Sequence, residues 1–365
     1  MKFRCERDTL ADAIAVAQRA VASRTGALPV LSGLRVSPSG NGVELVGSDL
    51  ELTIRVEAPA DAEGDGSAVV PARLFSEIVH KLDPGTVAVE FTDDEARVEA
   101  GRFRTSLRTL SAADFPRLSE PEGAGVKVAA GSLAEALRQV VPAASKDDAR
   151  PILTGVLLTA SAGGLRLVAT DSYRLAVRDL QGVSMLPEGQ SVLVAGKGLN
   201  EVQRLLGEQE IEVVLAEREV VFRIGNTSVT TRLIEGDFPN YEQLIPSGYP
   251  NKLTVARDQL SAATNRVRLV GQGRDTAPIR LGMNAEGLEL SAVAQDVGEA
   301  HEAVEAKYEG SDVTVAFNSQ FLLEGIEAAA GSEVVIESID PLKPAVLKGT
   351  DSTEFLYLLM PVRIS

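Results

Sequence analysis

The stretch Leu28-Pro-Val-Leu-Ser-Gly-Leu34 returns later in the chain as Arg150-Pro-Ile-Leu-Thr-Gly-Val156. The two prolines, Pro29 and Pro151, are separated by 122 positions (151 − 29), and a fainter third copy is Ala277-Pro-Ile-Arg-Leu281. Self-similarity at a fixed period indicates one structural unit used several times. Three repeats of this length account for all 365 residues.

The composition restricts the functional classes. A net charge of −16 repels anionic polymers at long range, although a local basic surface can still attract phosphates. The single cysteine, Cys5, excludes an internal disulfide, and the first residues lack the apolar core of a signal peptide. We therefore expect a cytoplasmic protein. No stretch reaches the roughly 18 apolar residues of a membrane-spanning helix.

Metal and cofactor motifs are not found. His80 and His301 fall in different repeats, and one cysteine provides no metal-ligand spacing. Val194-Ala-Gly-Lys197 lacks the rest of a phosphate-binding loop and is better interpreted as the start of a helix, and Gly271-Gln-Gly273 as a loop. We expect no metal and no cofactor.

Each repeat has the same predicted order of elements. Apolar residues three and four apart, such as Leu10 and Ile14, predict an amphipathic helix after a first short strand. In the second repeat, Ser132 followed by Glu135 predicts a capping box at the start of this helix. Alternating strands, a second helix and further strands follow. This order indicates an α+β fold with helices packed on antiparallel sheets.

Domain boundaries are expected where proline, glycine and polar residues gather. The two stretches of this kind are 119–125 and 246–251. They divide the chain into domains 1–121, 125–246 and 251–365. Each has a size that can fold around its own hydrophobic core.

The segment Thr170-Asp-Ser-Tyr-Arg174 concentrates an acid, hydroxyls and a guanidinium group. Such groups could orient a substrate in an enzyme centred on Asp171, Tyr173 and Arg174. The alternative is a strand end at which Asp171 and Arg174 form a structural ion pair. The C-terminal run Leu356–Ile364 is similarly open between a core edge strand and a binding surface.

The chain resembles the beta subunit of bacterial DNA polymerase III, the sliding clamp. The resemblance covers residues 1–365 and is carried by Ala169-Thr-Asp-Ser-Tyr-Arg-Leu-Ala176, Glu235-Gly-Asp-Phe-Pro-Asn-Tyr241, Ala316-Phe-Asn-Ser-Gln-Phe321 and Tyr357-Leu-Leu-Met-Pro-Val-Arg-Ile364. It implies three similar clamp domains per chain. Two chains are expected to close head to tail into a ring around duplex DNA, with helices inside and sheets outside.

The resemblance also implies function and partners. The expected function is that of a non-catalytic processivity factor in DNA replication. A clamp loader opens the homodimeric ring, and the ring then tethers the alpha subunit of the replicative polymerase and other proteins that carry a clamp-binding motif. Two alternatives stay open besides the enzyme: a clamp paralogue whose altered pocket confers drug resistance, and a purely structural scaffold.

A partner-peptide pocket between the second and third domains is implied by the same resemblance. The matching residues are mostly apolar, which suits short peptides because their anchoring side chains lose water. Tyr173 and Gln243 stand where the family commonly has an imidazole and a basic side chain, so peptide preference is expected to differ. The full set is Leu153, Thr170, Ser172, Tyr173, Arg174, Leu175, Pro239, Gln243, Leu244, Asn318, Phe321, Leu342, Pro344, Leu358, Leu359, Met360, Pro361 and Val362.

Basic residues on the predicted helices, at their ends or in the loop 145–150 are candidates for phosphate contacts. The residues are Arg24, Arg73, Lys146, Arg150, Lys197 and Arg204, of which Arg24 and the loop 145–150 match DNA-contacting positions of the family. Interspersed acids leave open that these are ordinary solvated faces. Asp147 and Asp148 in that loop oppose its attraction for phosphate.

Opposite charges near the two ends of the chain favour head-to-tail pairing of two chains. Arg102 and Arg104 lie in a basic strand, whereas Glu299 and Glu302 lie in an acidic one. Edge strands must be covered or blunted. By resemblance, the apolar centre of the dimer interface is expected to contain Leu107, Leu269 and Val270.

Overall fold

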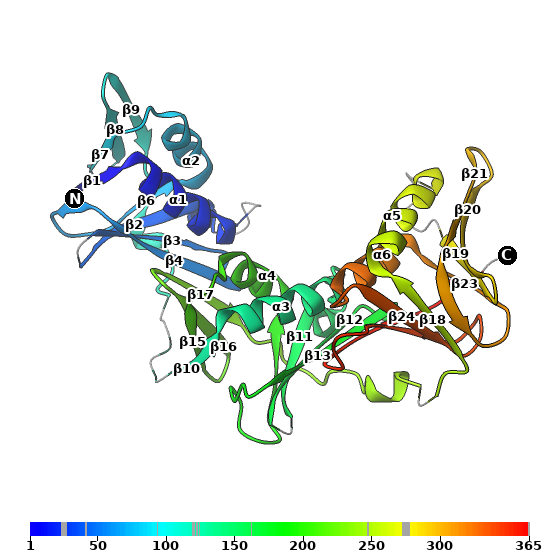
Figure 1. The fold of residues 1–365 in the computed structure, drawn as a ribbon. Helices are drawn as coiled ribbons and strands as arrows, with labels where there is room; N and C mark the ends of the chain where they lie inside the picture. Colours follow the sequence, from blue (N-terminus) through cyan, green and yellow to red (C-terminus); the bar gives the residue numbers. More distant parts are fainter. Residues whose placement is uncertain are drawn as a thin grey trace. The chain divides into compact units, whose positions relative to one another are not determined.

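The computed structural model describes residues 1–22, 28–40, 42–92, 94–118, 121, 123, 125–161, 163–246, 248–271 and 278–363. The chain divides into two compact units (Figure 1). The first contains Met1–Gly131 and Lys197–Leu233, and the second contains Ser132–Gly196 and Ile234–Ser365. The chain therefore passes between the units within its second repeat.

Two antiparallel sheets build the first unit. Their strand orders are β5-β1-β7-β8-β9 and β10-β15-β16-β17-β4-β3-β2-β6, and helices α1 and α2 pack against each other beside them (Figure 1). The elements are β1 (Lys2–Glu6), α1 (Arg7–Ala17), β2 (Gly33–Ser39), β3 (Gly42–Ser48), β4 (Leu52–Pro59), β5 (Asp61–Glu63), β6 (Ala68–Pro71), α2 (Ala72–Lys81), β7 (Thr86–Phe91), β8 (Glu95–Ala100), β9 (Phe103–Arg108), β10 (Val126–Ala129), α4 (Gly196–Leu205), β15 (Glu210–Leu215), β16 (Glu219–Ile224) and β17 (Thr227–Arg232).

The second unit also contains two antiparallel sheets. Their orders are β14-β11-β12-β13-β26-β25-β24-β18-β22 and β21-β20-β19-β23, with α5 and α6 packed together. The elements are α3 (Ala130–Val140), β11 (Gly155–Ser161), β12 (Gly164–Thr170), β13 (Arg174–Gln181), β14 (Ser191–Ala195), β18 (Asn251–Ala256), α5 (Arg257–Val267), β19 (Pro278–Asn284), β20 (Gly287–Ala294), β21 (Gly298–Val304), β22 (Ala306–Glu309), β23 (Val313–Asn318), α6 (Ser319–Ala328), β24 (Glu333–Ser338), β25 (Ala345–Gly349) and β26 (Phe355–Leu359).

Main-chain pairing joins successive repeats. Strand β4 of the first repeat pairs with β17 of the second, with Leu52 opposite Thr231. Strand β13 of the second repeat pairs with β26 of the third, with Arg174 opposite Leu359. The predicted order of strand, helix, strands, strand, helix and strands is confirmed in every repeat.

The helices follow the predicted apolar periodicity, with one correction. Leu10 and Ile14 of α1 are fully buried, as predicted. The predicted capping box is wrong: α3 begins at Ala130, because β10 ends at Ala129 and leads directly into the helix. Ser132 therefore lies within the first turn, and Glu135 accepts a hydrogen bond from Arg138 Nη2 at 2.6 Å instead.

Two of the short motifs have defined outcomes. The interpretation of Val194–Lys197 as the start of a helix is confirmed, because α4 begins at Gly196. Of the Gly271–Gly273 motif, positions 272 and 273 lie outside the described residues.

No helix in the described ranges is long and apolar enough to cross a membrane. No group of three His, Cys, Asp or Glu side chains in the same ranges is placed to hold a metal ion.

Two helical glycines provide a test of packing around Tyr357. A Cβ atom at Gly325 of α6 would lie 2.5 Å from the ring of Tyr357, which is 1% exposed, whereas a Cβ at Gly131 of α3 meets nothing within 4 Å. We expect Gly325→Ala to lower the free energy of unfolding by about 1–3 kcal/mol through overpacking. Gly131→Ala should raise it by roughly 0.5 kcal/mol through helix propensity.

Urea denaturation followed by circular dichroism measures both changes. Equal stability of the two variants would contradict close packing of α6 against Tyr357.

Candidate partner-binding site

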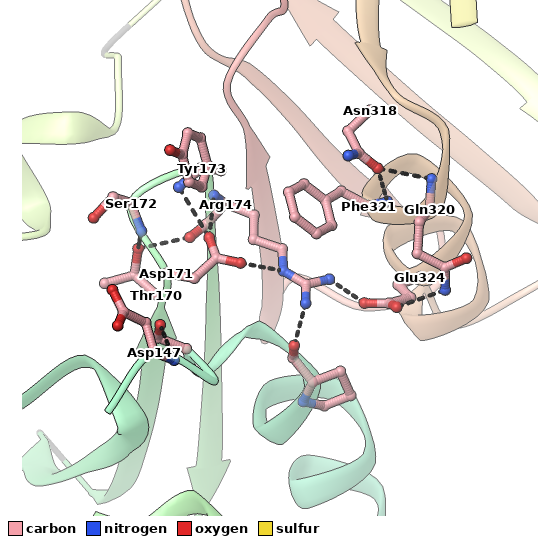
Figure 2. Close-up of polar contacts among 12 residues, drawn as sticks. Asp147, Thr170, Asp171, Ser172, Tyr173, Arg174, Asn318, Gln320, Phe321 and Glu324 are labelled. Carbon is pink, nitrogen blue, oxygen red and sulfur yellow. Dashed lines mark hydrogen bonds and ion pairs between the residues drawn. The ribbon is translucent and has the colours of Figure 1, made fainter. Parts of the chain in front are cut away.

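A buried arginine organises the start of β13. Arg174 Nε donates to Asp171 Oδ2 at 3.0 Å, and its Nη1 atom donates to Glu324 and to the hydroxyl of Tyr357. Its Nη2 atom donates to the carbonyl oxygen of Pro142 (Figure 2). The guanidinium group thus connects a turn, a helix and a strand that are distant in sequence.

The charge of Arg174 is retained despite its burial. Burial alone disfavours the charged guanidinium, but Tyr357 and Glu324 outweigh it and raise the pKa of Arg174. Burial also raises the pKa of the Tyr357 hydroxyl. The guanidinium carbon lies 4.2 Å from the centre of the Phe321 ring, a cation–π arrangement. The interpretation of Asp171 and Arg174 as a structural ion pair is confirmed.

The turn before β13 is held by side-chain hydrogen bonds to the backbone. Asp171 Oδ1 accepts from the amides of Tyr173 at 2.9 Å and Arg174 at 3.0 Å (Figure 2). Thr170 Oγ1 accepts from the amide of Ser172 at 3.2 Å. Ser172 has a φ of 79°, in the left-handed region that non-glycine residues rarely adopt. The turn directs the Tyr173 side chain outward.

The C-terminal strand places a second apolar side chain beside this turn. Strand β26 lies between β13 and β25, so the alternative of an edge strand is wrong. Tyr357 and Leu359 are buried, as expected for inward-facing positions. Beyond the strand, the Met360 amide donates to the carbonyl oxygen of Tyr173 at 2.9 Å. Met360 and Tyr173 are therefore neighbours.

The other predicted pocket residues differ in exposure. Four large apolar side chains are exposed: Leu342 by 66%, Tyr173 by 61%, Leu244 by 45% and Met360 by 38%. Ser172, Pro239 and Gln243 are exposed too, and Asn318, Phe321, Pro344, Pro361 and Val362 are half-buried. Leu153, Thr170, Arg174, Leu175, Leu358 and Leu359 are buried. Leu175 and Leu358 pack in a buried cluster with Tyr241 and Val346.

Helix α6 begins at a cap that positions Phe321. The Asn318 side-chain oxygen accepts from the amides of Gln320 at 2.9 Å and Phe321 at 3.2 Å (Figure 2). Asparagine is among the most favourable N-cap residues. The cap fixes the first turn of the helix, and the Phe321 ring lies over Arg174 as a result.

Comparison with known proteins identifies the family. Family models for the N-terminal, central and C-terminal domains of the DNA polymerase III beta subunit match residues 1–119, 127–240 and 242–363. The chain belongs to this family. Its fold is accordingly the three-domain clamp fold, with helices packed on antiparallel sheets.

Individual relatives agree over the full length. The beta sliding clamp of Streptomyces coelicolor is 34% identical, with 100% of both chains covered. The crystal structure of the DNA polymerase sliding clamp from Bacillus subtilis has a TM-score of 0.91 and 29% identity, with 100% of both chains covered. A DNA polymerase III subunit beta from Pseudomonas aeruginosa bound to griselimycin has a TM-score of 0.89 and 30% identity, again over 100% of both chains.

The candidate DNA-contacting residues mostly have acidic neighbours. Arg73 Nε pairs with Glu77 at 2.9 Å, Arg204 Nη1 pairs with Glu201 at 3.1 Å, and Lys197 pairs with Asp49. Arg24 lies outside the described residues.

The loop that contains Lys146 and Arg150 has an internal ion pair. Lys146 is exposed. Arg150 Nε donates to Asp147 Oδ2 at 2.9 Å, and its Nη1 atom donates to Ser172 Oγ at 3.0 Å. The hydrogen bond from Arg150 lowers the pKa of the Asp147 carboxyl group. Asp147 thus holds the arginine that is predicted to meet phosphate.

The two oppositely charged strands, β9 and β21, are both edge strands of their sheets. Arg102 lies in the turn before β9 (Phe103–Arg108), so its predicted place in the strand is wrong; Arg102 and Glu299 are exposed. Arg104 Nε pairs with Glu99 at 3.4 Å, and Glu302 pairs with Arg266 Nε at 2.9 Å. Of the expected apolar centre, Leu107 is buried, Leu269 is exposed and Val270 is half-buried.

Sequence reasoning missed the distant partners of Arg174. Glu324 and Pro142 lie 150 and 32 positions from Arg174 in the sequence, so no local spacing indicates them. One signal was available: Glu324 follows Phe321 by three positions in a predicted helix, so the two share a face.

Truncating Arg174 tests the buried network. Arg174→Ala leaves the carboxylates of Asp171 and Glu324 without their cation, and we expect a loss of about 3–5 kcal/mol in the free energy of unfolding. Arg73→Ala removes an exposed ion pair on α2, with side chains 93% and 55% exposed, and should change stability by roughly 0.5 kcal/mol or less. Urea denaturation compares the two, and similar losses would contradict the central role of Arg174.

Proposed function

We infer that this protein is a DNA sliding clamp, a non-catalytic processivity factor that encircles duplex DNA and tethers the replicative polymerase. The observation that carries the inference is the match of all three beta-subunit domains along the chain. A tether acts through effective concentration: a polymerase that releases the primer end stays nearby and rebinds before it diffuses away. Its partners are DNA, the polymerase alpha subunit, the clamp loader and other clamp-binding proteins.

The proposed docking surface for partner peptides comprises Tyr173, Leu244, Leu342 and Met360 with the residues around them. Met360 and Tyr173 are neighbours, and exposed apolar side chains that lie together mark interaction sites. Methionine adapts its shape to different ligands. The buried Arg174 network gives this surface a rigid base, which reduces the conformational entropy lost on binding.

Peptide binding tests the docking surface. We expect a fluorescein-labelled peptide from the clamp-binding segment of a replicative polymerase to bind saturably in fluorescence anisotropy. Met360→Ala combined with Pro361→Ala should weaken binding at least roughly tenfold, because the apolar contact beside Tyr173 is removed. Val126→Ala is the control, because Val126 on β10 has the same exposed fraction as Met360, 38%. Unchanged binding by the double variant would refute the docking surface.

The proposed DNA contacts are Arg24, Arg73, Lys146, Arg150, Lys197 and Arg204. They would reach phosphates only, so binding should be weak, independent of sequence and strongly dependent on salt. A clamp that slides needs contacts of this kind. The acidic partners of Arg73, Arg150, Lys197 and Arg204 keep the contacts of these four residues weak.

Asp147→Asn tests whether the acidic loop restrains DNA binding. The substitution frees Arg150 while an amide oxygen can still accept from the Ala149 backbone, as Asp147 Oδ1 does at 3.1 Å. We expect roughly two- to fivefold tighter binding of a labelled duplex at low salt. Asp148→Asn changes the net charge equally in the same loop and should have a smaller effect. Equal effects would show that only net charge matters.

The proposed ring forms by head-to-tail pairing of two chains. The basic edge strand β9 of one chain would meet the acidic edge strand β21 of the other, and two-fold symmetry would repeat this contact. A hollow of about 1010 Å³ beside β9, lined partly by Leu74, Ile78 and Phe103, offers space for an apolar side chain such as the partner's Leu269. Leu107 supports this interface from within.

We also propose the domain boundaries 1–121, 125–246 and 251–365, and a cytoplasmic location. The boundaries follow the proline- and glycine-rich stretches of the sequence. The location follows from the role in replication of bacterial DNA.

A further inference from the structure

The turn at Thr170–Arg174 has a structural copy in the first repeat. Leu50, with a φ of 76°, and Ser172 are the two non-glycine residues with positive φ among the described residues. They are 122 positions apart (172 − 50), which is the repeat period. Asp49 Oδ1 accepts from the amides of Glu51 at 3.0 Å and Leu52 at 2.8 Å, as Asp171 does in its own turn.

The strand that follows is copied as well. The Arg232 amide donates to the carbonyl oxygen of Glu51 at 3.0 Å, and this bond corresponds to that between Met360 and Tyr173. Arg232 therefore occupies the position of Met360, and Glu51 that of Tyr173. The backbone of the proposed docking surface is present twice, but its apolar side chains are replaced by charged ones in the first copy.

The first copy borders a small hollow of about 180 Å³ that we call the basic hollow. It is lined in part by Leu50, Arg55, Pro116, Arg117, Glu219 and Arg232. Non-glycine residues with positive φ cost free energy and cluster at binding sites. All of these lining residues belong to the first compact unit.

The arginines of the basic hollow are incompletely neutralised. Arg55 is only 9% exposed; its Nη1 atom lies 4.0 Å from Glu44 Oε2, and its Nη2 atom donates to the Leu118 carbonyl oxygen at 2.6 Å. Its Nε atom is buried and has no hydrogen-bond partner among the described residues. Arg117 and Arg232 are exposed and form no ion pair within the described ranges. The guanidinium groups of Arg117 and Arg232 are therefore the ones that can meet an anionic ligand.

We propose that the basic hollow binds a carboxylate of an acidic peptide segment of a partner protein. A guanidinium group donates two parallel hydrogen bonds to a planar carboxylate. The hollow has room for a single side chain or chain terminus, and the nearby Glu51 and Glu219 disfavour the larger negative charge of phosphate. This proposal rests on the proposed function only because the basic hollow resembles the proposed docking surface in its backbone. The two sites would bind different peptides, acidic in the basic hollow and apolar at the docking surface.

The probe is a fluorescein-labelled Gly-Gly-Glu-Asp-Glu peptide with a free C-terminal carboxylate, titrated with the full-length protein at low salt. We expect saturable binding that Arg117→Gln with Arg232→Gln weakens at least roughly tenfold. Arg97→Gln, at an exposed arginine on β8 of the same unit, removes one positive charge where the double variant removes two, and should change affinity less than about twofold. Circular dichroism checks that each variant folds.

Two further arms separate the possible ligands and the two sites. A C-terminally amidated probe distinguishes a chain terminus from side chains: lost binding assigns the terminal carboxylate, and retained binding assigns the side chains. Met360→Ala with Pro361→Ala should leave binding of the acidic probe unchanged. A failure of the proposed docking surface can therefore be distinguished from a failure of the basic hollow. Absent binding, equal weakening by Arg97→Gln, or displacement by inorganic phosphate as readily as by glutarate would overturn the proposal.

Discussion

Main-chain pairing between successive repeats is the constraint on which the other features depend. The second and third repeats each end in a strand that extends a sheet of the preceding repeat: β17 lies beside β4, and β26 lies beside β13. Ladder hydrogen bonds fix register to the residue, since a slip of one position would turn every side chain to the opposite face. This register sets Arg174 opposite Leu359 and Met360 beside Tyr173. The position of the proposed docking surface therefore depends first on backbone geometry and second on side chains.

The order of helices and strands could be predicted from the sequence because the same pattern occurs three times along the chain. Helix and strand order followed from apolar periodicity, and the family resemblance followed from motifs such as Glu235–Tyr241 and Tyr357–Ile364. The capping box at Ser132 failed because the sequence cannot show that β10 continues without a break into α3. The start of α3 is therefore set by the end of the preceding strand and not by the local preference of Ser132 for a cap position.

The candidate site was predictable only in part. The pairing of Asp171 with Arg174 was visible from their spacing of three, but the contribution of Glu324 depends on long-range packing of α6. Burial was equally hidden: Leu175 and Leu358 look like surface candidates by position, yet they form part of the core. A sequence motif can indicate which residues lie near one another. The exposure of their side chains depends on packing against segments that are distant in the sequence.

The three repeats and the two compact units have different boundaries. The chain passes from one unit to the other at Gly131–Ser132, Gly196–Lys197 and Leu233–Ile234, all around or within the second repeat. Because the chain crosses between the units three times, a single backbone cut at any one crossing would leave the two units covalently joined. The segment that repeats in the sequence therefore differs from the segment that forms a compact unit. A gene that loses one repeat would lose half a sheet from its neighbour, so the repeat number can change only if new strand partners are supplied at once.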